Sequence, residues 1–403
     1  MKTIIKIAWR NIWRHKTRSL VIILAMALGL VSGIFILALN WGLSIERVNK
    51  AIATETSHIQ IHHPKFREDF DPKYNFAIDT TIFTKNEKIK DFAPRSIVFG
   101  MVNSANSAAG VKINGVNFIK ENKVTKFKDK LIEGALVYQY KRTLPVYISQ
   151  ATAEKLKVHI RSKIVVTFQD VNNQMVSAAF KVRGIFKTSN SMWDKGNIFV
   201  PITSLQQLLG TNNYQEIAVL LHNNDDLETV ANELQNQLPT LKVETWKDIM
   251  PEMKMMVESF DQMMNIIIFI ILLTLAFGLI NTMLMAILER TREIGMLMAI
   301  GMNKKKIFTM IMTESLLLSL IGVPFGLLAS WGIIEMFQKT GIDLSAYAKG
   351  MEEWGFDTVV YPQMEPEFYT QITVQVVVIM FLASVYPAYK ALKLKPVDAL
   401  RKI

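Results

Sequence analysis

Residues 263–287 read MMNIIIFIILLTLAFGLINTMLMAI, and residues 288–302 continue with LERTREIGMLMAIGM. The first stretch carries no charged residue and is longer than the roughly 20 residues that an α-helix needs to cross a bilayer. Three other long apolar stretches, at 20–39, 308–337 and 370–386, are predicted to span the membrane as well. In lipid a single segment satisfies its backbone polar groups only as a helix. The sequence therefore predicts an α-helical membrane protein with four transmembrane helices.

The orientation of these helices follows from the distribution of basic residues. Lys and Arg gather before the first span (Lys2, Lys6, Arg10, Arg14, Lys16, Arg18), between the second and third spans (Arg290, Arg292, Lys304, Lys305, Lys306) and after the fourth (Lys390, Lys393, Lys395, Arg401, Lys402). Short loops rich in Lys and Arg stay in the cytoplasm. Both termini are therefore expected inside, and residues 40–262 and the mainly acidic segment 338–369 outside.

The composition excludes several classes of protein. The 403 residues include 46 Lys and Arg against 35 Asp and Glu, half are hydrophobic, and there is no Cys. Disulfide scaffolds, Cys-ligated metal centres and thiol nucleophiles are thereby excluded. Because topology accounts for much of the positive charge, we expect no binding of nucleic acid.

The first span is expected to be a signal anchor, since its apolar stretch exceeds the 7–15 residues of a cleaved signal peptide. Before it, Ile5, Trp9, Ile12 and Trp13 recur at helical spacing opposite basic residues, which predicts an amphipathic helix at the membrane surface. The expected domains are 1–19 (amphipathic helix), 20–39, 263–287, 308–337 and 370–386 (spans), 40–262 and 338–369 (outside), and 288–307 and 387–403 (cytoplasmic).

Residues 40–262 change to short β-type patterns that alternate with helical ones. Strands are predicted at 57–62, 96–102, 111–116, 163–169, 178–186, 197–201, 216–222 and 241–245, and helices at 150–156, 203–209 and 226–237. This pattern predicts a large α+β extracytoplasmic domain inserted between the first and second spans.

Candidate catalytic chemistry is scarce. His58, Gln60 and His62 alternate on one predicted strand with His63 beside them, but no carboxylate near them in sequence completes a metal site, so a solvated polar face is the prediction. No G-x-S-x-G motif and no P-loop are present. We therefore expect no catalytic residue, no metal site and no bound cofactor in this chain.

The stretch 288–302 has the pattern of a short cytoplasmic helix. Ile294, Leu297 and Met298 fall on one side, and Glu293 lies near the start, where a negative charge suits the helix dipole. Gly301 is placed to end the helix. A helix held in this way between two spans could push on both.

The segment resembles the E-R-T-R-E-I-G-x-x-x-A-x-G signature of permease subunits in the MacB, LolC/LolE and FtsX group of ABC transporters. Further similarity comes from Thr313-Glu314-Ser315, from the ending at 386–401 with Pro387-Ala388 and Pro396-Val397-Asp398-Ala399-Leu400-Arg401, and from 146–165 with 198–201 in the outer domain. The resemblance extends over the whole chain and is strongest at 288–301 and in the tail.

The resemblance implies a permease of the bacterial inner membrane that pairs with a second permease subunit, identical or homologous, and with two cytosolic ATPase subunits, which bind ATP and Mg²⁺. The residues expected to couple to the ATPase are Arg292, Glu293, Ile294, Gly295, Met296, Met298 and Gly301. In this family a mechanical stroke of the outer domain moves a substrate from the outer leaflet. Release of lipoproteins or other amphiphiles is the leading expectation, with a periplasmic carrier or adaptor as a further partner.

Two alternatives remain open: an unfused MacB-like exporter of peptides or drugs, and an FtsX-like signalling permease that regulates a cell-wall hydrolase. The sequence lacks the ATPase domain fused to macrolide exporters, and its outer domain is larger than that of FtsX. The loop within 165–182 is shorter than the hook with which LolC recruits its carrier.

Inside the membrane, Gly29 and Gly33 in the first span and Gly322 and Gly326 in the third allow close helix packing, most simply within one subunit. The methionine-rich approach to the second span is expected to pack under the outer domain. The sharper hypothesis is a lateral opening for acyl chains, formed by Leu37, Leu39, Trp41, Met256, Phe260, Met263 and Met264. Glu314 is expected to pair with Arg292 or with one of Lys304, Lys305 and Lys306.

Overall fold

The computed structural model describes residues 2–14, 16–105, 107–138, 140 and 143–393. The predicted signature at 395–401 lies outside the described residues. The chain divides into two compact units. The helical unit comprises Met1–Leu43, Glu258–Asp343 and Val359–Ile403, and the α+β unit comprises Ser44–Val257 and Leu344–Thr358.

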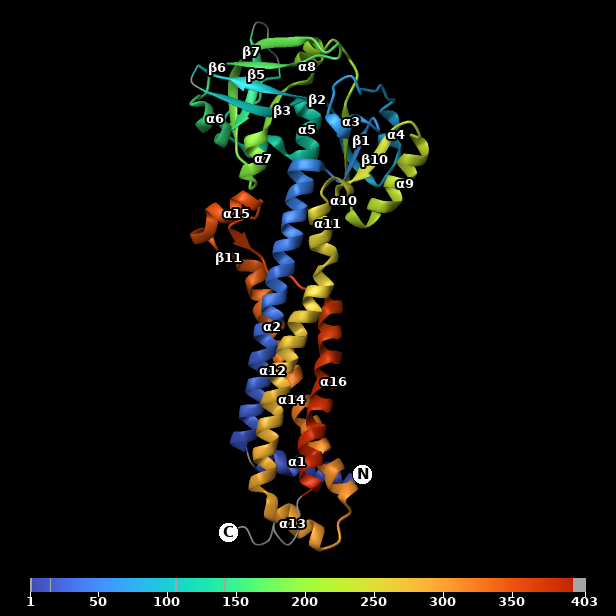
Figure 1. Cartoon of the computed structure of the whole chain (residues 1–403), viewed down its shortest axis with the longest axis vertical. Coiled ribbons are helices and arrows are strands. Elements are labelled where there is room, and N and C mark those ends of the chain that lie inside the picture. The colour runs from blue at the N-terminus through green and yellow to red at the C-terminus, as the bar shows by residue number, and fades with distance from the viewer. Residues whose placement is uncertain (1, 15, 106, 139, 141–142, 394–403) are drawn as a thin grey trace. The chain divides into compact units, whose positions relative to one another are not determined.

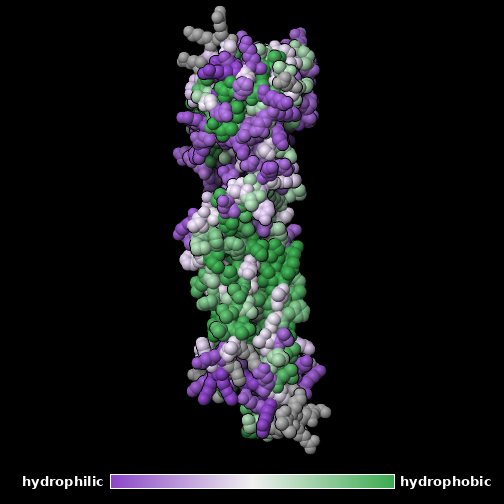
Figure 2. Space-filling view, turned by 90° about the vertical axis from the view of Figure 1, so that its left-hand side faces the viewer, coloured by the Kyte–Doolittle hydropathy of each residue, from purple (hydrophilic) through white to green (hydrophobic). Residues whose placement is uncertain are grey.

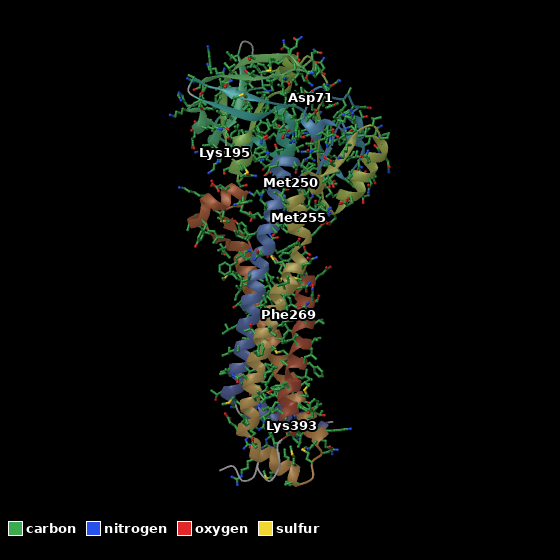
Figure 3. All side chains as sticks on the ribbon, viewed as in Figure 1. Asp71, Lys195, Met250, Met255, Phe269 and Lys393 are labelled. Carbon is green, nitrogen blue, oxygen red and sulfur yellow. The ribbon has the colours of Figure 1, made fainter. Side chains whose placement is uncertain are left out.

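Four long helices build the helical unit (Figure 1): α2 (Lys16–Ala51), whose last turns belong to the α+β unit, α12 (Phe260–Glu289), α14 (Lys304–Thr340) and α16 (Pro366–Leu392). Among the described residues four helices are long and apolar enough to cross a membrane, and they contain the four predicted spans. Their outward side chains, such as Phe269 (labelled in Figure 3), are apolar and exposed. Figure 2 shows the resulting hydrophobic belt, with hydrophilic residues at one end of the unit.

The small residues of the spans lie at contacts within the chain. A Cβ on Gly29 would come within 2.7 Å of Leu275 in α12, and a Cβ on Gly33 would meet Ile271 of the same helix. A Cβ on Gly326 would come within 3.1 Å of the Cβ of Leu30 in α2, and Gly322 faces Met26. These glycines therefore let α2 approach both α12 and α14 closely.

Gly42 provides a sharper test of this packing. A Cβ at this position would collide with the backbone oxygen of Tyr361, just before the point where Gln363 N–H donates to the Ala38 carbonyl at 3.0 Å. Gly42→Ala should therefore displace 361–363 at a cost of about 1–3 kcal/mol, seen as faster hydrogen exchange at Gln363. Gly278→Ala is the control, because nothing lies within 4 Å of a Cβ there. Unchanged protection of Gln363 would refute the contact.

The α+β unit contains one large sheet, in the order β10-β1-β9-β2-β3-β8-β5-β7-β4, with β6 paired to both β2 and β7. The strands are β1 (Ile59–His62), β2 (Ile89–Asn103), β3 (Ala108–Val116), β4 (Leu131–Gly134), β5 (Leu144–Ser149), β6 (Lys163–Gln169), β7 (Met175–Phe186), β8 (Asn197–Pro201), β9 (Glu216–Leu221) and β10 (Lys242–Thr245). Of the strand pairs within the described residues, only β3–β8 and β5–β7 are parallel.

The sheet forms two lobes that share β2. Strand β6 closes the path β2-β3-β8-β5-β7 into a six-stranded ring, whose core also takes residues of α6 (Gln150–Leu156) and α8 (Ile202–Leu209). The other lobe joins β10, β1 and β9 to the start of β2 and packs on α4 (Thr81–Lys85), α9 (Leu227–Gln237) and α10 (Trp246–Ile249). Arg95 lies on β2 where pairing with β9 ends and pairing with β3 begins.

The predicted α+β class is confirmed, and β6, β8 and α6 have the predicted bounds. The sequence interpretation missed β4, β5, the π-helix η1 (Ile52–Thr56) and several short helices, among them α3 (Phe66–Asp69), α4, α5 (Phe118–Thr125), α7 (Ser191–Gly196) and α10. Strand β5 is buried along nearly all its length, so no alternation marks it, and β4 is a short strand with mostly exposed side chains.

Candidate functional site

The predicted helix between the second and third spans is α13 (Thr291–Ala299). At its start, Thr291 Oγ1 donates to the Leu288 carbonyl at 2.7 Å, which ties α13 to the end of α12. At its end, Gly301 has φ +94°, a left-handed backbone that favours glycine, and Met302 N–H donates to the Leu297 carbonyl at 3.0 Å. Both ends are thus fixed by local hydrogen bonds.

One face of α13 packs into the helical unit and the other is open. Ile294 and Gly295 are buried, and Ile294 joins the same apolar core as Ile287 and Ile307. On the other face Met296 is 50% exposed, and Ile300, just after the helix, is 79% exposed. Met296 and Ile300 are four positions apart and together place two large apolar side chains on the open side of this segment, where a partner protein could bury them.

A network of charges joins α13 to its neighbours. Arg290 Nε donates to Glu293 at 3.1 Å, and its Nη1 donates to Glu314 of α14 at 3.2 Å. Glu293 also lies 3.2 Å from Nη1 of Arg14 in α1 (Lys2–Arg14). The expected pairing of Glu314 with Arg292 or with Lys304, Lys305 or Lys306 is wrong. Arg290, which directly follows α12, forms the ion pair with Glu314 instead. A cavity of about 20 Å³ beside this pair is large enough for one water molecule.

The seven residues expected to couple to an ATPase have different positions in the structure. Arg292, Met296 and Gly301 are exposed, Glu293 and Met298 are partly exposed, and Ile294 and Gly295 are buried. The exposed residues are therefore accessible to a partner. The buried Ile294 and Gly295 instead fix the packing of α13 against the helical unit. Arg290 and Ile300 were not among the residues predicted from the sequence. The available signals were the three-residue spacing between Arg290 and Glu293 and the large apolar side chain directly before Gly301.

The residues of the expected lateral opening lie in two separate cores. Leu37, Phe260 and Met264 are buried in the core of the helical unit, where the Trp41 and Phe260 rings are in contact, tilted by 45° with centroids 4.5 Å apart. Met256 packs against the core of the α+β unit, on α11 (Pro251–Glu258). Leu39 is partly buried and Met263 is exposed. Most of these side chains therefore pack in the core of one unit or the other.

The predicted solvated face of β1 is wrong. His62 and Gln60 are buried: Gln60 Nε2 donates to the Thr56 carbonyl at 3.0 Å, and the His62 ring lies against Phe66. His62 Nε2 is 2.9 Å from Glu244, which also pairs with Arg67 and Lys242. Although burial opposes it, hydrogen bonds from His62, Lys242 and Arg67 lower the pKa of the Glu244 carboxyl. Among the described residues, no group of three or more His, Cys, Asp or Glu could hold a metal ion.

His58 makes the stability of this lobe depend on pH. Burial lowers its pKa from 6.5 to about 4, and Nδ1 accepts the Leu221 N–H at 3.2 Å, which requires the unprotonated nitrogen. Below pH 6.5 the unfolded chain therefore binds a proton that the folded chain does not, so stability falls as pH drops from 6.5 to 4.

We expect a loss of about 2 kcal/mol over this range, allowing for the partial exposure of the ring. His58→Asn keeps an acceptor and does not titrate, so it should remove this part of the pH dependence. The measurement is hydrogen exchange at the β9 amides of wild type and variant, compared at each pH. Identical pH profiles for the two proteins would contradict the assignment.

Comparison with known proteins agrees with this arrangement. The MacB-like periplasmic core domain matches residues 19–237, and the FtsX-like permease C-terminal domain matches residues 265–396. The uncharacterized ABC transporter permease YvrN of Bacillus subtilis is 24% identical, with 98% of each chain covered. The lipoprotein-releasing system transmembrane protein LolC of Xylella fastidiosa is 23% identical over 70% of each chain.

The macrolide export ATP-binding/permease protein MacB of Hahella chejuensis is 23% identical over 98% of this chain, which spans 60% of that protein. The match to the periplasmic core domain alone extends over more than half of this chain. The permease domain match contains α13, α14 and α16 and most of α12. The chain therefore belongs to the ABC transporter permeases of the MacB, LolC and FtsX type.

Proposed function

We propose that a separate cytosolic ABC ATPase drives this permease through α13. The observation that carries this proposal is the open apolar face at Met296 and Ile300, on a helix whose other face is packed into the bundle. A partner that binds this face can displace α13, and the Arg290 contacts with Glu293 and Glu314 pass that displacement to α14. Two ATPase subunits and a second permease subunit, identical or homologous, complete the assembly.

We place the protein in the bacterial inner membrane with both termini and α13 in the cytoplasm. The positive charges near α1, α13 and the end of α16 support this orientation. The α+β unit is then periplasmic, where it acts on a substrate in or near the outer leaflet. Catalysis of ATP hydrolysis, with its Mg²⁺, takes place on the partner.

The substrate we favour is a lipoprotein or another amphiphile, extracted by a stroke of the α+β unit. Similarity to LolC over 70% of the chain supports this choice. Similarity to MacB over 98% of the chain supports the alternative, export of peptides or drugs with an adaptor. A signalling role through a cell-wall hydrolase, without transport, is the third reading and rests on the FtsX-like domain.

Native mass spectrometry separates these functions. The complex is purified in mild detergent with the ATPase partner blocked in hydrolysis, so that loaded states accumulate. Bound acylated lipoproteins, with or without a periplasmic carrier, would support release. An adaptor without lipoprotein would move the assignment to export, and a hydrolase without any substrate would move it to signalling. Absence of any ATPase would contradict the proposal as a whole.

Substitution of Glu293 tests whether the displacement of α13 is transmitted through the contacts of this side chain. Glu293→Ala removes the contacts with Arg14 and Arg290 but leaves the exposed face of α13 intact. We expect assembly with the ATPase and ATP turnover to persist, while transport per ATP falls about tenfold, equivalent to about 1.4 kcal/mol of coupling. Lys304→Ala, which removes an exposed charge at the start of α14, should leave transport per ATP unchanged. Wild-type transport by Glu293→Ala in reconstituted vesicles would refute this route.

A further inference from the structure

The segment between the third and fourth spans belongs to the α+β unit. Residues Leu344–Thr358 cluster with Ser44–Val257, although nearly ninety residues of other structure separate the two in sequence. The segment contains the 3-10 helix η4 (Ser345–Tyr347) and α15 (Ala348–Trp354). Figure 1 shows α15 below α7 and beside the upper part of α2, and α15 packs against α7. We call Leu344–Thr358 the strap.

A buried arginine holds the strap. Arg47, on the last turns of α2, is only 7% exposed, and its Nε donates to the carbonyl of Trp354 at 2.9 Å. Its Nη1 lies 3.0 Å from Glu55 of η1, whose Oε1 accepts from Asn190 Nδ2 at 3.0 Å. Asn190 is the N-cap of α7. One guanidinium thus connects α2, η1, α7 and the strap.

Two ion pairs add to this attachment. Lys50 Nζ lies 2.8 Å from Asp357, and Lys187 Nζ, just beyond β7, lies 3.1 Å from Glu352. All four side chains are partly exposed, and such pairs each contribute about 0–1 kcal/mol. The buried Arg47 contact is the stronger one, because losing one partner would leave the Glu55 charge buried and uncompensated.

Gly355 is fitted to this contact. Its φ of +79° is left-handed, and a Cβ there would come within 2.7 Å of Arg47 Nε and 2.8 Å of Cζ. Any other residue would be strained and would push the guanidinium away from the Trp354 carbonyl. Gly350, on α15, has nothing within 4 Å of a Cβ. The strap thus offers one glycine that its attachment requires and one that it does not.

We propose that the strap transmits motion from α14 and α16 to the α+β unit, with Arg47 as the residue that positions it. This inference rests on the proposed function. Motion of the helical unit can then reach the α+β unit through four chain connections: α2, α11 and the two ends of the strap. The first two are continuous chain, whereas the strap acts only while Arg47 and its ion pairs keep it attached.

The test compares Gly355→Ala and Arg47→Met with the control Gly350→Ala, each in the full chain with its ATPase. The first readout is hydrogen exchange of the amides at 351–358. We expect exchange to become at least tenfold faster in Gly355→Ala and Arg47→Met and to stay within twofold of wild type in Gly350→Ala. Lys187→Glu should raise exchange about threefold, and adding Glu352→Lys should restore it.

The second readout is transport per ATP, which should fall at least fivefold in Gly355→Ala while ATP turnover and assembly persist. Wild-type exchange in both Gly355→Ala and Arg47→Met would show that Arg47 does not hold the strap. Faster exchange with unchanged transport per ATP would show that an attached strap is not needed for the stroke. If wild-type protein moves no substrate at all, the proposed function fails, and the exchange data alone decide the attachment.

Discussion

A chain with Met296→Asp and Ile300→Asp should lose its ATPase partner while keeping its fold. Both side chains are exposed, at 50% and 79%, so aspartate costs little in the free permease. In the complex the same positions would be buried, and a carboxylate buried without a partner is costly. Two such substitutions in the proposed interface should weaken binding at least a hundredfold, or about 2.7 kcal/mol.

The measurement is co-purification of the ATPase with the tagged permease, followed by titration in nanodiscs. The matched control is Ile132→Asp with Met175→Asp, which changes the same residue types at 51% and 66% exposure in the α+β unit. The control should bind the ATPase normally. Equal binding by both double variants would show that the apolar face of α13 is not the docking site.

The second large effect concerns the fold of the α+β unit. Arg95 is buried between Glu121 of α5, at 2.7 Å, and Glu216 of β9, at 2.9 Å. Burial alone would raise the pKa of Glu216, but Lys112 and Arg95 hold it below its usual value, so the carboxylate stays charged. Because Arg95 marks the strand position shared by the two lobes, this cluster fixes the lobes to each other.

Arg95→Met should destabilise the α+β unit by about 3–5 kcal/mol, because it leaves two carboxylates buried without their main partner. Hydrogen exchange at the β2 and β9 amides should accelerate at least a hundredfold. Adding Glu121→Leu should recover about half of this loss, since Glu216 then retains Lys112, 4.0 Å away. Wild-type exchange rates in Arg95→Met would contradict this role of Arg95. So would faster exchange in the Arg95→Met, Glu121→Leu double variant than in Arg95→Met alone.

The sequence predicted the elements whose pattern is local. Each span is a long apolar run, and α13 carries an acidic residue near its start, Glu293, and a glycine just after its end, Gly301, so composition and spacing were enough. Strand β6 is bounded by polar turn residues, and β8 lies between Gly196 and the Pro201 that precedes α8, so both strands were predicted with their exact bounds. Strand β5 has no alternation because nearly all its length is buried, which left it unrecognised.

The contacts that organise the site could not be predicted, because they depend on tertiary structure. Arg290 and Glu314 are 24 positions apart, and Arg47 and Trp354 are 307 apart, so no spacing rule connects them. The acidic segment 338–369 was expected to be one outer loop, but its middle belongs to the α+β unit and its ends to the helical unit. His62 looked like a surface residue because Glu244, one of the groups that it contacts in the interior, is 182 positions away in the sequence.

The most direct test of the central claim is a single cysteine at Met296. The chain has no native Cys, so Met296→Cys labels one exposed position on α13 with a photo-crosslinker in native membranes. We expect a crosslink to an ABC ATPase, with a yield that changes when ATP is replaced by a non-hydrolysable analogue. A crosslink to any other protein, or none to an ATPase from a correctly folded permease, would contradict it.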